Sequence, residues 1–284
     1  MTYKIVSDSS SNIFSITGAD YATVPMKVIA AKEYIDSPQL DLQGMVKDLK
    51  AHKGKSGSSC PNVGEWLEAF GDADMIFGVT ISKNLSGSYN AAQQAAEEYM
   101  EQNPGKRVYI FDSLAAGPQQ AMLIDKINQL IQEGCDFDTI VEKAREYHNH
   151  THILFCLESL TNLARNGRVS TAAATIAGIL GIRGVGDVRE GQITTVAKPR
   201  GAKKATQTLL EMLKERGFNN NSTLRIAHCF GETAANALFE AAKAEFPGCR
   251  TILEPTSGLC SFYAEAGGLM IGFDGGFNEN NCHN

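Results

Sequence analysis

The pattern of hydrophobic and polar positions divides the first half of the chain into alternating strands and helices. Short hydrophobic runs, typical of buried strands, occupy residues 3–8, 21–30, 74–80 and 107–113. Helices are predicted near residues 41–52, 64–70, 87–102, 117–132 and 137–148. Because strands that alternate with helices favour a parallel sheet covered by helices, this half is predicted to be an α/β domain with a parallel sheet flanked by helices.

The second half has a different order of elements. A strand is predicted at 152–157, a short helix before Gly167, and a hairpin at 187–198 that turns at Glu190 and Gly191. Further helices are predicted at 202–216 and 232–246, and further strands at 223–229 and 250–255. We place a domain boundary near residue 150, so that residues 1–150 and 151–284 form an N-terminal and a C-terminal domain.

Two apolar segments of the second half are rich in small residues. They cover residues 171–182 and 258–273. Small side chains leave room beside a backbone, so either segment can line a channel; the alternative is that both fill an ordinary buried core. Neither segment reaches the roughly 18 apolar residues that a membrane span requires.

Composition and charge narrow the class of protein. The chain has 284 residues, of which 43% are hydrophobic and 20% charged, which is typical of a folded protein. Its net charge of -6 disfavours broad binding to nucleic acid, whose phosphates require a basic face. The first residues lack the apolar stretch of a signal peptide, and the seven cysteines show no CxxC spacing. We therefore expect a cytoplasmic protein without stable membrane insertion.

Four polar loops mark a candidate anion site. They cover residues 7–12, 56–62, 81–90 and 111–117, and most of them follow predicted strands and precede helices. Ligands of open parallel sheets bind beyond the strand ends, where helix N-termini present free N–H groups. Within NLSGSYN, Gly87 permits close approach of the backbone, and Ser86 and Ser88 offer hydroxyl donors. The candidate residues of the other three loops are Ser9, Ser58 and Ser113; the alternative is that these serines only cap helices.

Catalytic and metal motifs are weak by comparison. The chain has no GxSxG elbow, and none of its six histidines lies in a recognisable triad context. His148, His150 and His152 alternate as zinc ligands on a strand would, but they lie where a helix ends, which itself favours histidine. We predict no metal site. The segment KPRGAKK places four cations, including Arg200, at a helix start and suggests an anion contact or a docking patch for an acidic partner.

Several segments, taken in order, resemble the DegV family of bacterial fatty-acid-binding proteins. SDSSSN resembles the family's DS-rich turn, SSCPN its TSQPS loop and FDSLAAG its DSxxxSxG turn. ISKNLSGSYNAA resembles SSxLSGTYxSA, and LESLTNLARNGRVS resembles LxxLxxGGRIS. The segment PRGAKKA is similar to the family's basic helix start, so the resemblance extends over nearly the whole chain.

The resemblance implies both a fold and a function. It implies a parallel sheet in the N-terminal domain, a mixed sheet in a C-terminal α/β domain, and a ligand at the domain junction. A long-chain fatty acid would lie in an apolar tunnel, with its carboxylate held by Ser58 and Ser86. Arg200 matches a position of the head-group network or of kinase docking, and Arg168 matches the GGRIS arginine. The protein would be a non-catalytic carrier, without a cofactor, that presents the acid to a fatty acid kinase.

The chain also departs from the family pattern. YAEAGG replaces the family's HxGPG, with Ala264 at or near the histidine position and Tyr263 or Glu265 close by, neither of which is equivalent to an imidazole. Asn12 replaces a second acid in the first loop, and Cys60 replaces a polar residue. Two alternatives therefore stay open: an enzyme for an anionic substrate that uses Asp8 or Asp112 as acid or base, and a regulatory protein with a vestigial pocket.

Overall fold

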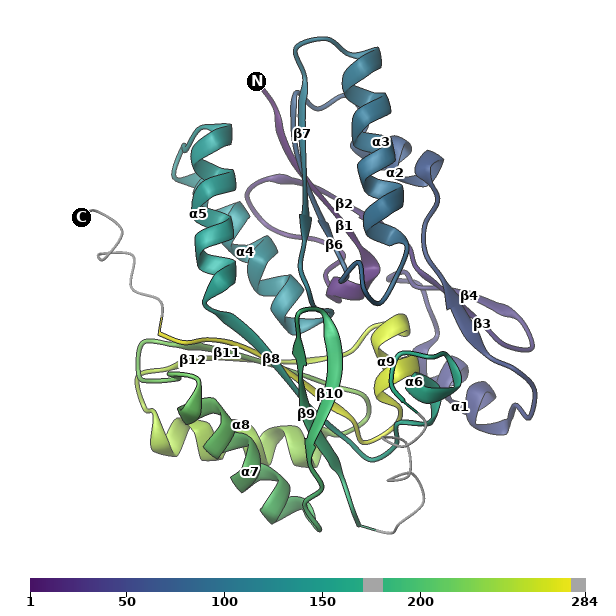
Figure 1. The fold of residues 1–284 in the computed structure, drawn as a ribbon, viewed down its shortest axis with the longest axis vertical. Coiled ribbons are helices and arrows are strands. Elements are labelled where there is room, and N and C mark those ends of the chain that lie inside the picture. The colour runs from purple at the N-terminus through teal and green to yellow at the C-terminus, as the bar shows by residue number, and fades with distance from the viewer. Residues whose placement is uncertain (171–180, 277–284) are drawn as a thin grey trace.

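The computed structural model describes residues 1–170 and 181–276 (Figure 1). In this part of the chain the strands form two larger sheets and one small sheet. The strands are β1 (Tyr3–Asp8), β2 (Asp20–Val24), β3 (Lys27–Ile29), β4 (Glu33–Ile35), β5 (Gly57–Ser59), β6 (Met75–Thr80), β7 (Arg107–Asp112), β8 (Thr151–Leu157), β9 (Gly184–Arg189), β10 (Gln192–Ala197), β11 (Thr223–His228), β12 (Arg250–Pro255) and β13 (Leu269–Asp274). The helices are α1 (Leu42–Ala51), α2 (Val63–Phe70), α3 (Ser88–Gln102), α4 (Pro118–Gln132), α5 (Phe137–Asn149), α6 (Thr161–Arg165), α7 (Ala202–Glu215), α8 (Glu232–Glu245) and α9 (Gly258–Ala264), with a 3-10 turn at Ser9–Ser11.

The first sheet is wholly parallel, in the order β2-β1-β6-β7. Helices α2 and α3 lie on one face and α4 and α5 on the other (Figure 1). Alternate residues of each central strand serve the two faces: Val6 and Ile76 pack with Trp66 of α2, while Ile5 and Phe77 pack with α4 and α5. Burial on both faces explains the continuous hydrophobic runs and confirms the predicted N-terminal architecture.

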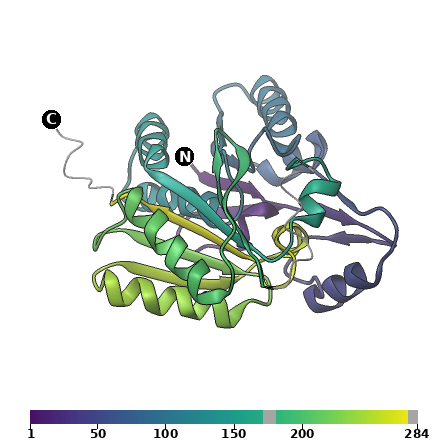
Figure 2. The same ribbon diagram turned by 60° about the horizontal axis from the view of Figure 1, so that its bottom comes forward.

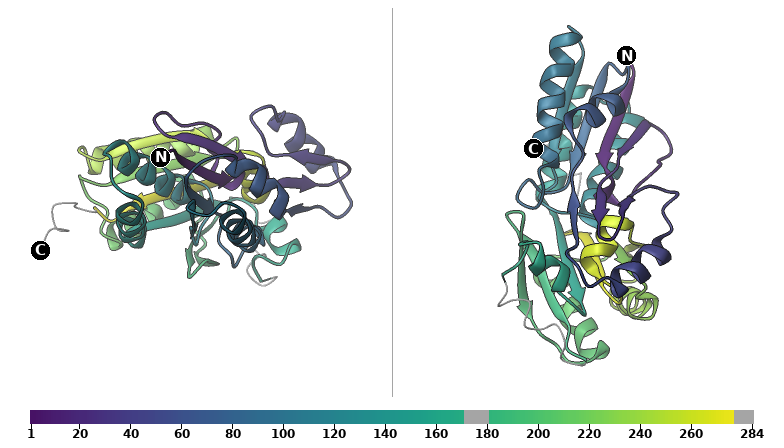
Figure 3. Two further views of the ribbon diagram at one scale, coloured as in Figure 1. Left: turned by 90° about the horizontal axis from the view of Figure 1, so that it is seen from above. Right: turned by 90° about the vertical axis from the view of Figure 1, so that its right-hand side faces the viewer.

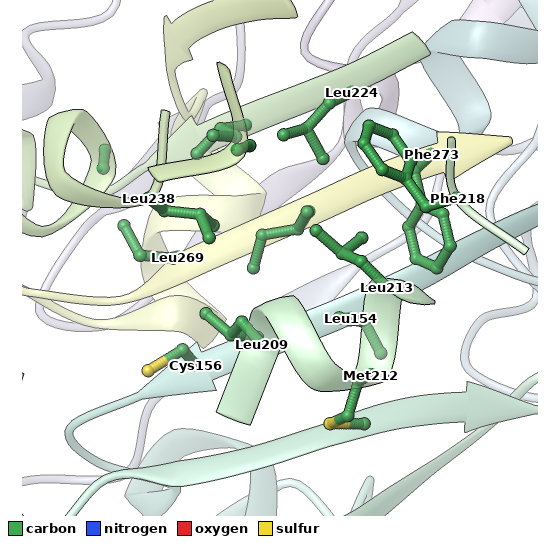
Figure 4. Close-up of a cluster of buried hydrophobic side chains, with 14 of the residues drawn as sticks. Leu154, Cys156, Leu209, Met212, Leu213, Phe218, Leu224, Leu238, Leu269 and Phe273 are labelled. Carbon is green, nitrogen blue, oxygen red and sulfur yellow. The ribbon is translucent and has the colours of Figure 1, made fainter. Parts of the chain in front are cut away.

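The second sheet is mixed, in the order β10-β9-β8-β13-β11-β12. Only β11 and β12 pair in parallel, and every other neighbouring pair is antiparallel. Helices α7 and α8 cover one face (Figure 2), where Leu154, Leu213 and Phe273 belong to one buried cluster (Figure 4). The mixed sheet that the resemblance implies is therefore confirmed, and its opposite face is turned toward the first half of the chain.

Helix α4 lies between the two larger sheets. It packs against β1 and β6 of the first sheet and against β8, β11 and β13 of the second. Gly272 makes this approach possible, since a Cβ atom there would lie 2.7 Å from backbone atoms of Pro118 and Gln119. The guanidinium of Arg225 on β11 adds a polar link, donating to the Asp125 carboxylate of α4 at 2.6 Å. The second sheet begins at Thr151; the domain boundary near residue 150 stays a prediction.

Two segments fold differently from the hydrophobic pattern. The single strand predicted at 21–30 is wrong: Pro25 separates β2, in the first sheet, from β3, in a small antiparallel sheet of order β4-β3-β5. Proline lacks the N–H that a continuous ladder needs, so the chain changes sheets there. In Figure 3 this small sheet lies to one side of the molecule, away from α7 and α8. The glycine-rich end forms α9 and then β13, which lies between β8 and β11.

Other local predictions are confirmed. The helix predicted at 64–70 is α2, which begins after Asn62 in a reciprocal capping box with Glu65, and Gly167 follows α6 with a positive φ of 71°. Glu190 and Gly191, at φ 49° and 74°, form the predicted hairpin turn. Most of the predicted segment 171–182 lies outside the described residues. Among the helices of residues 1–170 and 181–276, none is long and apolar enough to cross a membrane.

Candidate ligand-binding site

A cavity of about 280 Å³ lies where the second sheet faces the first half of the chain. Its walls come from β5, the loop after β6, α9, the residues around α6, and strands β8, β9, β10 and β13. Pockets that hold small organic ligands span about 300–1,000 Å³, so this cavity is close to the lower end of that range. The cavity is thus placed at the junction of the two predicted domains.

The larger part of the cavity wall is apolar. Strand β8 supplies Ile153, Phe155 and Leu157, which alternate along the strand with residues of the α7 and α8 side such as Leu154. Successive strand residues point to opposite faces, so one strand builds both the core under the helices and the cavity wall. Met270 of β13, paired with Phe155 in the ladder, extends this wall.

Hydroxyl groups gather at one part of the cavity. The Ser58 hydroxyl on β5 lies 2.8 Å from the Tyr263 hydroxyl on α9, which joins two segments far apart in the sequence. Ser86 lies in the loop before α3, where its hydroxyl accepts a bond from the backbone N–H two residues later at 3.3 Å. Next to it, a Cβ atom on Gly87 would lie 3.3 Å from Cys60 Sγ, so glycine leaves the space beside the thiol open.

A positive charge accompanies these hydroxyls. Arg168 lines the same cavity, and its guanidinium lies 5.9 Å from the centre of the Tyr263 ring. Its Nε donates to the Leu85 carbonyl at 3.3 Å, which links the arginine to the loop that carries Ser86. A guanidinium beside hydroxyl donors is suited to a carboxylate or another small anion. The site therefore joins an anion-binding end to an apolar chamber.

The acidic residue nearest the serine loop is closed off by its own hydrogen bonds. Asp8 is fully buried and does not line the cavity. Its Oδ2 accepts from the Ile81 N–H at 2.9 Å and the Ser88 hydroxyl at 2.6 Å, and its Oδ1 accepts from Gln120 at 3.0 Å and from Ser10. This network holds the loop after β6 in place, and it leaves Asp8 without contact to a ligand in the cavity.

Four of the eight predicted contact residues lie outside this cavity. Ser88 donates to Asp8, Ser113 donates to its own turn at 3.1 Å, and Ser9 donates to Asp36 at 2.8 Å. All three serines are fully buried, so their hydroxyls serve the protein interior. Arg200 is exposed on the approach to α7. The four that line the cavity are Ser58, Ser86, Gly87 and Tyr263.

Asp36 positions the tyrosine. Its carboxylate accepts the N–H groups of Gly258 and Leu259, at 2.7 and 3.0 Å, where α9 begins. Burial raises the pKa of Asp36, while these N–H groups and two hydroxyls act in the opposite direction. Because a carboxylate is favourable at a helix N-terminus, Asp36 fixes the start of α9 and hence the place of Tyr263.

The three alternating histidines do not converge. His148 lies in the last turn of α5 and contacts Thr151, His150 caps that helix, and His152 packs its ring against Phe273. Burial lowers the pKa of His148 to about 4. In residues 1–170 and 181–276 no group of three or more histidine, cysteine or acidic side chains is placed to hold a metal ion.

Several cavity residues were not singled out from the sequence. The alternation of Ile153, Phe155 and Leu157 was the available signal, because it predicts one common face for all three side chains. Arg168 drew attention only through the resemblance. Its place beside Tyr263 depends on how α6 and α9 pack together, which a local pattern does not contain.

Fold and cavity together define a class of α/β proteins in which two sheets share a central helix and enclose an apolar chamber with an anion-binding end. The profile of the family described as "Uncharacterised protein, DegV family" matches residues 2–274. The chain therefore belongs to the DegV family.

Relatives agree over nearly the whole length. A DegV domain-containing protein of Streptococcus gordonii is 36% identical over 280 residues, which cover 96% of this chain and 99% of the relative. A DegV family protein from Eubacterium eligens loaded with heptadecanoic acid is 36% identical, with a TM-score of 0.94 over 96% of this chain and 99% of that one. The Streptococcus pneumoniae Fatty Acid Kinase (Fak) B3 protein loaded with linoleic acid gives the same identity, TM-score and coverage.

Proposed function

We propose that this protein binds a long-chain fatty acid. The carboxylate is held by Ser58, Ser86, Tyr263 and Arg168, and the acyl chain lies against the apolar wall of β8. The observation that carries the proposal is that one cavity joins a guanidinium and hydroxyl end to an apolar chamber. The fatty acids bound by two relatives of the same fold and 36% identity support it.

The energetics of such a site favour the acyl chain. Each buried methylene contributes about 0.8 kcal/mol, so ten of them contribute about 8 kcal/mol before the cost of association. The polar end then sets the orientation of the ligand, and local donors suffice although the whole chain carries a charge of -6. An acyl chain without a carboxylate would lose these donors.

The carrier role belongs to the same proposal. The protein would present its fatty acid to a kinase subunit that forms the acyl phosphate, without catalysing the reaction itself and without a cofactor. The Streptococcus pneumoniae relative is named a Fatty Acid Kinase (Fak) B3 protein, which supports this role. If Ala264 corresponds to the family's HxGPG histidine, as the resemblance implies, the adjacent Tyr263 would provide a hydroxyl there.

A cytoplasmic location is part of the proposal. Six cysteines of the described residues are free thiols, among them the buried Cys156, Cys229, Cys249 and Cys260. Free thiols are typical of a reducing compartment.

The enzyme alternative has less support than the carrier. It needs an acid or base at the anion end, and neither Asp8 nor Asp112 lines the cavity. Asp112 accepts the backbone N–H groups of Lys83, in the loop after β6, and of Leu114, in its own turn, at 3.2 and 3.0 Å, so it links these two loops. The vestigial-pocket alternative has less support because the chamber and its polar end are both formed.

Titration calorimetry of delipidated protein with oleate and palmitate tests the proposal. We expect both acids to bind, and Ser86→Ala to weaken binding by about 1–3 kcal/mol, since a charged acceptor loses a donor. Ser15→Ala is the matched control, because Ser15 is exposed and lies outside the cavity. Absence of binding to the unchanged protein would refute the proposal, and unchanged affinity in Ser86→Ala would remove Ser86 from the site.

A further inference from the structure

A second cavity, of about 410 Å³, borders the apolar one. Its lining is polar and includes Gln119, Thr151, Asp187 and Arg216. Two aliphatic residues, Ile153 and Val188, line both cavities. They are the place where a ligand in the apolar chamber comes closest to the polar one.

The geometry of the sheet explains this division. The antiparallel ladder between β8 and β9 ends with the pair Leu154 and Asp187, although both strands continue. Ile153 and Val188 are the next residues on the two strands, so they lie where the pairing between β8 and β9 stops. Beyond them the same side of β8 carries Thr151, which accepts a bond from Gln119 at 3.0 Å and belongs to the polar cavity.

The groups beyond Ile153 and Val188 are unfavourable neighbours for an acyl chain. The Asp187 side chain is 4% exposed and pairs with Arg189 at 3.0 Å and with Arg216. In the described part of the chain its Oδ1 and the Arg216 Nη1 are buried without a hydrogen-bond partner, so this cluster already holds polar atoms that an acyl chain cannot satisfy. Methylenes pushed into the second cavity would lie against this ion-pair cluster and the other polar side chains of its lining, and would offer them no hydrogen bonds.

The polar end of the apolar cavity lies toward the other end of β8. Leu157 shares a cluster with Tyr263 and Leu163, while Ile153 lies four residues back along the strand. At about 3.3 Å per residue, this part of the wall runs for roughly 13 Å. An acid anchored beside Tyr263 therefore directs its methyl end toward Ile153 and Val188.

We propose that Ile153 and Val188 form the end wall of the acyl chamber and set the upper limit of chain length. The inference rests on the proposed function and names the residues that decide which fatty acids fit. Acids that stop before the wall gain affinity with every added carbon. Longer acids must bend, or must displace the two side chains and enter the polar cavity.

The test measures the affinity of delipidated protein for saturated fatty acids of about 12 to 20 carbons. Each acid competes with the same probe ligand. In the unchanged protein we expect about fourfold tighter binding for each added methylene, until a limit beyond which affinity stops rising. Ile153→Ala and Val188→Ala should each move this limit to longer acids by at least one two-carbon step. For the first acid beyond the original limit, each wall variant should bind at least about tenfold more tightly than the unchanged protein does.

Ile193→Ala is the matched control. Ile193 pairs with Val188 across the hairpin and lines the apolar cavity, but it does not line the polar one. It should enlarge the chamber without moving the length limit. An unmoved limit in both wall variants would overturn the inference, and so would an equal shift in Ile193→Ala. If no acid binds the unchanged protein, the proposed function itself is refuted. If Ile153→Ala does not fold, Val188→Ala, which is the smaller truncation, still tests the inference.

Discussion

Replacement of Tyr263 by phenylalanine tests how the carboxylate is held. The change removes one hydroxyl and keeps the ring, which packs 4.7 Å from the Phe262 ring and lies beneath the Arg168 guanidinium. With the fatty acid bound, the variant loses a hydrogen bond to a charged acceptor, about 1.5–3 kcal/mol. Without ligand it loses only the bond to Ser58, about 0.5–1.5 kcal/mol. The difference predicts that affinity falls by about 1–2 kcal/mol, or roughly 5- to 30-fold.

Comparison of a fatty acid with its methyl ester isolates this effect. Titration calorimetry should show weaker binding of oleate to Tyr263→Phe, while methyl oleate, which has no charged acceptor, binds both proteins within about twofold. Tyr89→Phe is the control, because Tyr89 contacts Gln93 on the surface of α3 and does not line the cavity. Equal losses for acid and ester, or no loss for the acid, would refute the assignment of Tyr263 to the carboxylate.

Three further predictions concern the scaffold and its pH dependence. Arg225→Ala should lower the free energy of unfolding by about 2–3 kcal/mol in urea, since it leaves two carboxylates unpaired, whereas Arg107→Ala, at an exposed pair, should cost less than about 1 kcal/mol. Gly272→Ala should lower the free energy of unfolding by about 1–3 kcal/mol, because the added methyl group meets the start of α4. An unchanged free energy of unfolding would contradict the packing of α4 against both sheets. Below pH 6.5 the unfolded chain protonates His148 and the folded chain does not until about pH 4, so this group lowers stability by about 1–2 kcal/mol at pH 5. That part of the pH dependence should vanish in His148→Gln, and an NMR titration of His148 with an unshifted pKa would contradict it.

The sequence predicted the first sheet because its signals are local. Strands β6 and β7 are short hydrophobic runs, and each is followed by a polar loop and a helix, so their parallel order follows without long-range information. The same reasoning failed at Pro25, where the hydrophobic pattern continues although the ladder cannot. It also left β13 undefined, because glycines such as Gly272 weaken a strand pattern exactly where close helix packing requires them.

The candidate site was predictable in part for a related reason. Ser58 and Ser86 lie in the cavity, but a serine-rich loop does not reveal which hydroxyl faces a ligand and which serves the interior. Ser9 and Ser88 were predicted to lie at the site from loop position alone, but in the structure both hydroxyls donate to buried carboxylates. Arg200 stood out by charge, whereas Arg168, which lines the cavity, is brought there only by tertiary packing.

Native mass spectrometry of the protein purified from cells tests the central claim most directly. The account predicts a mass increment of one co-purified fatty acid of about 16–18 carbons, bound one to one and exchangeable for added oleate. Protein that is free of lipid as purified, and that also fails to bind oleate or palmitate when either is added, would contradict it.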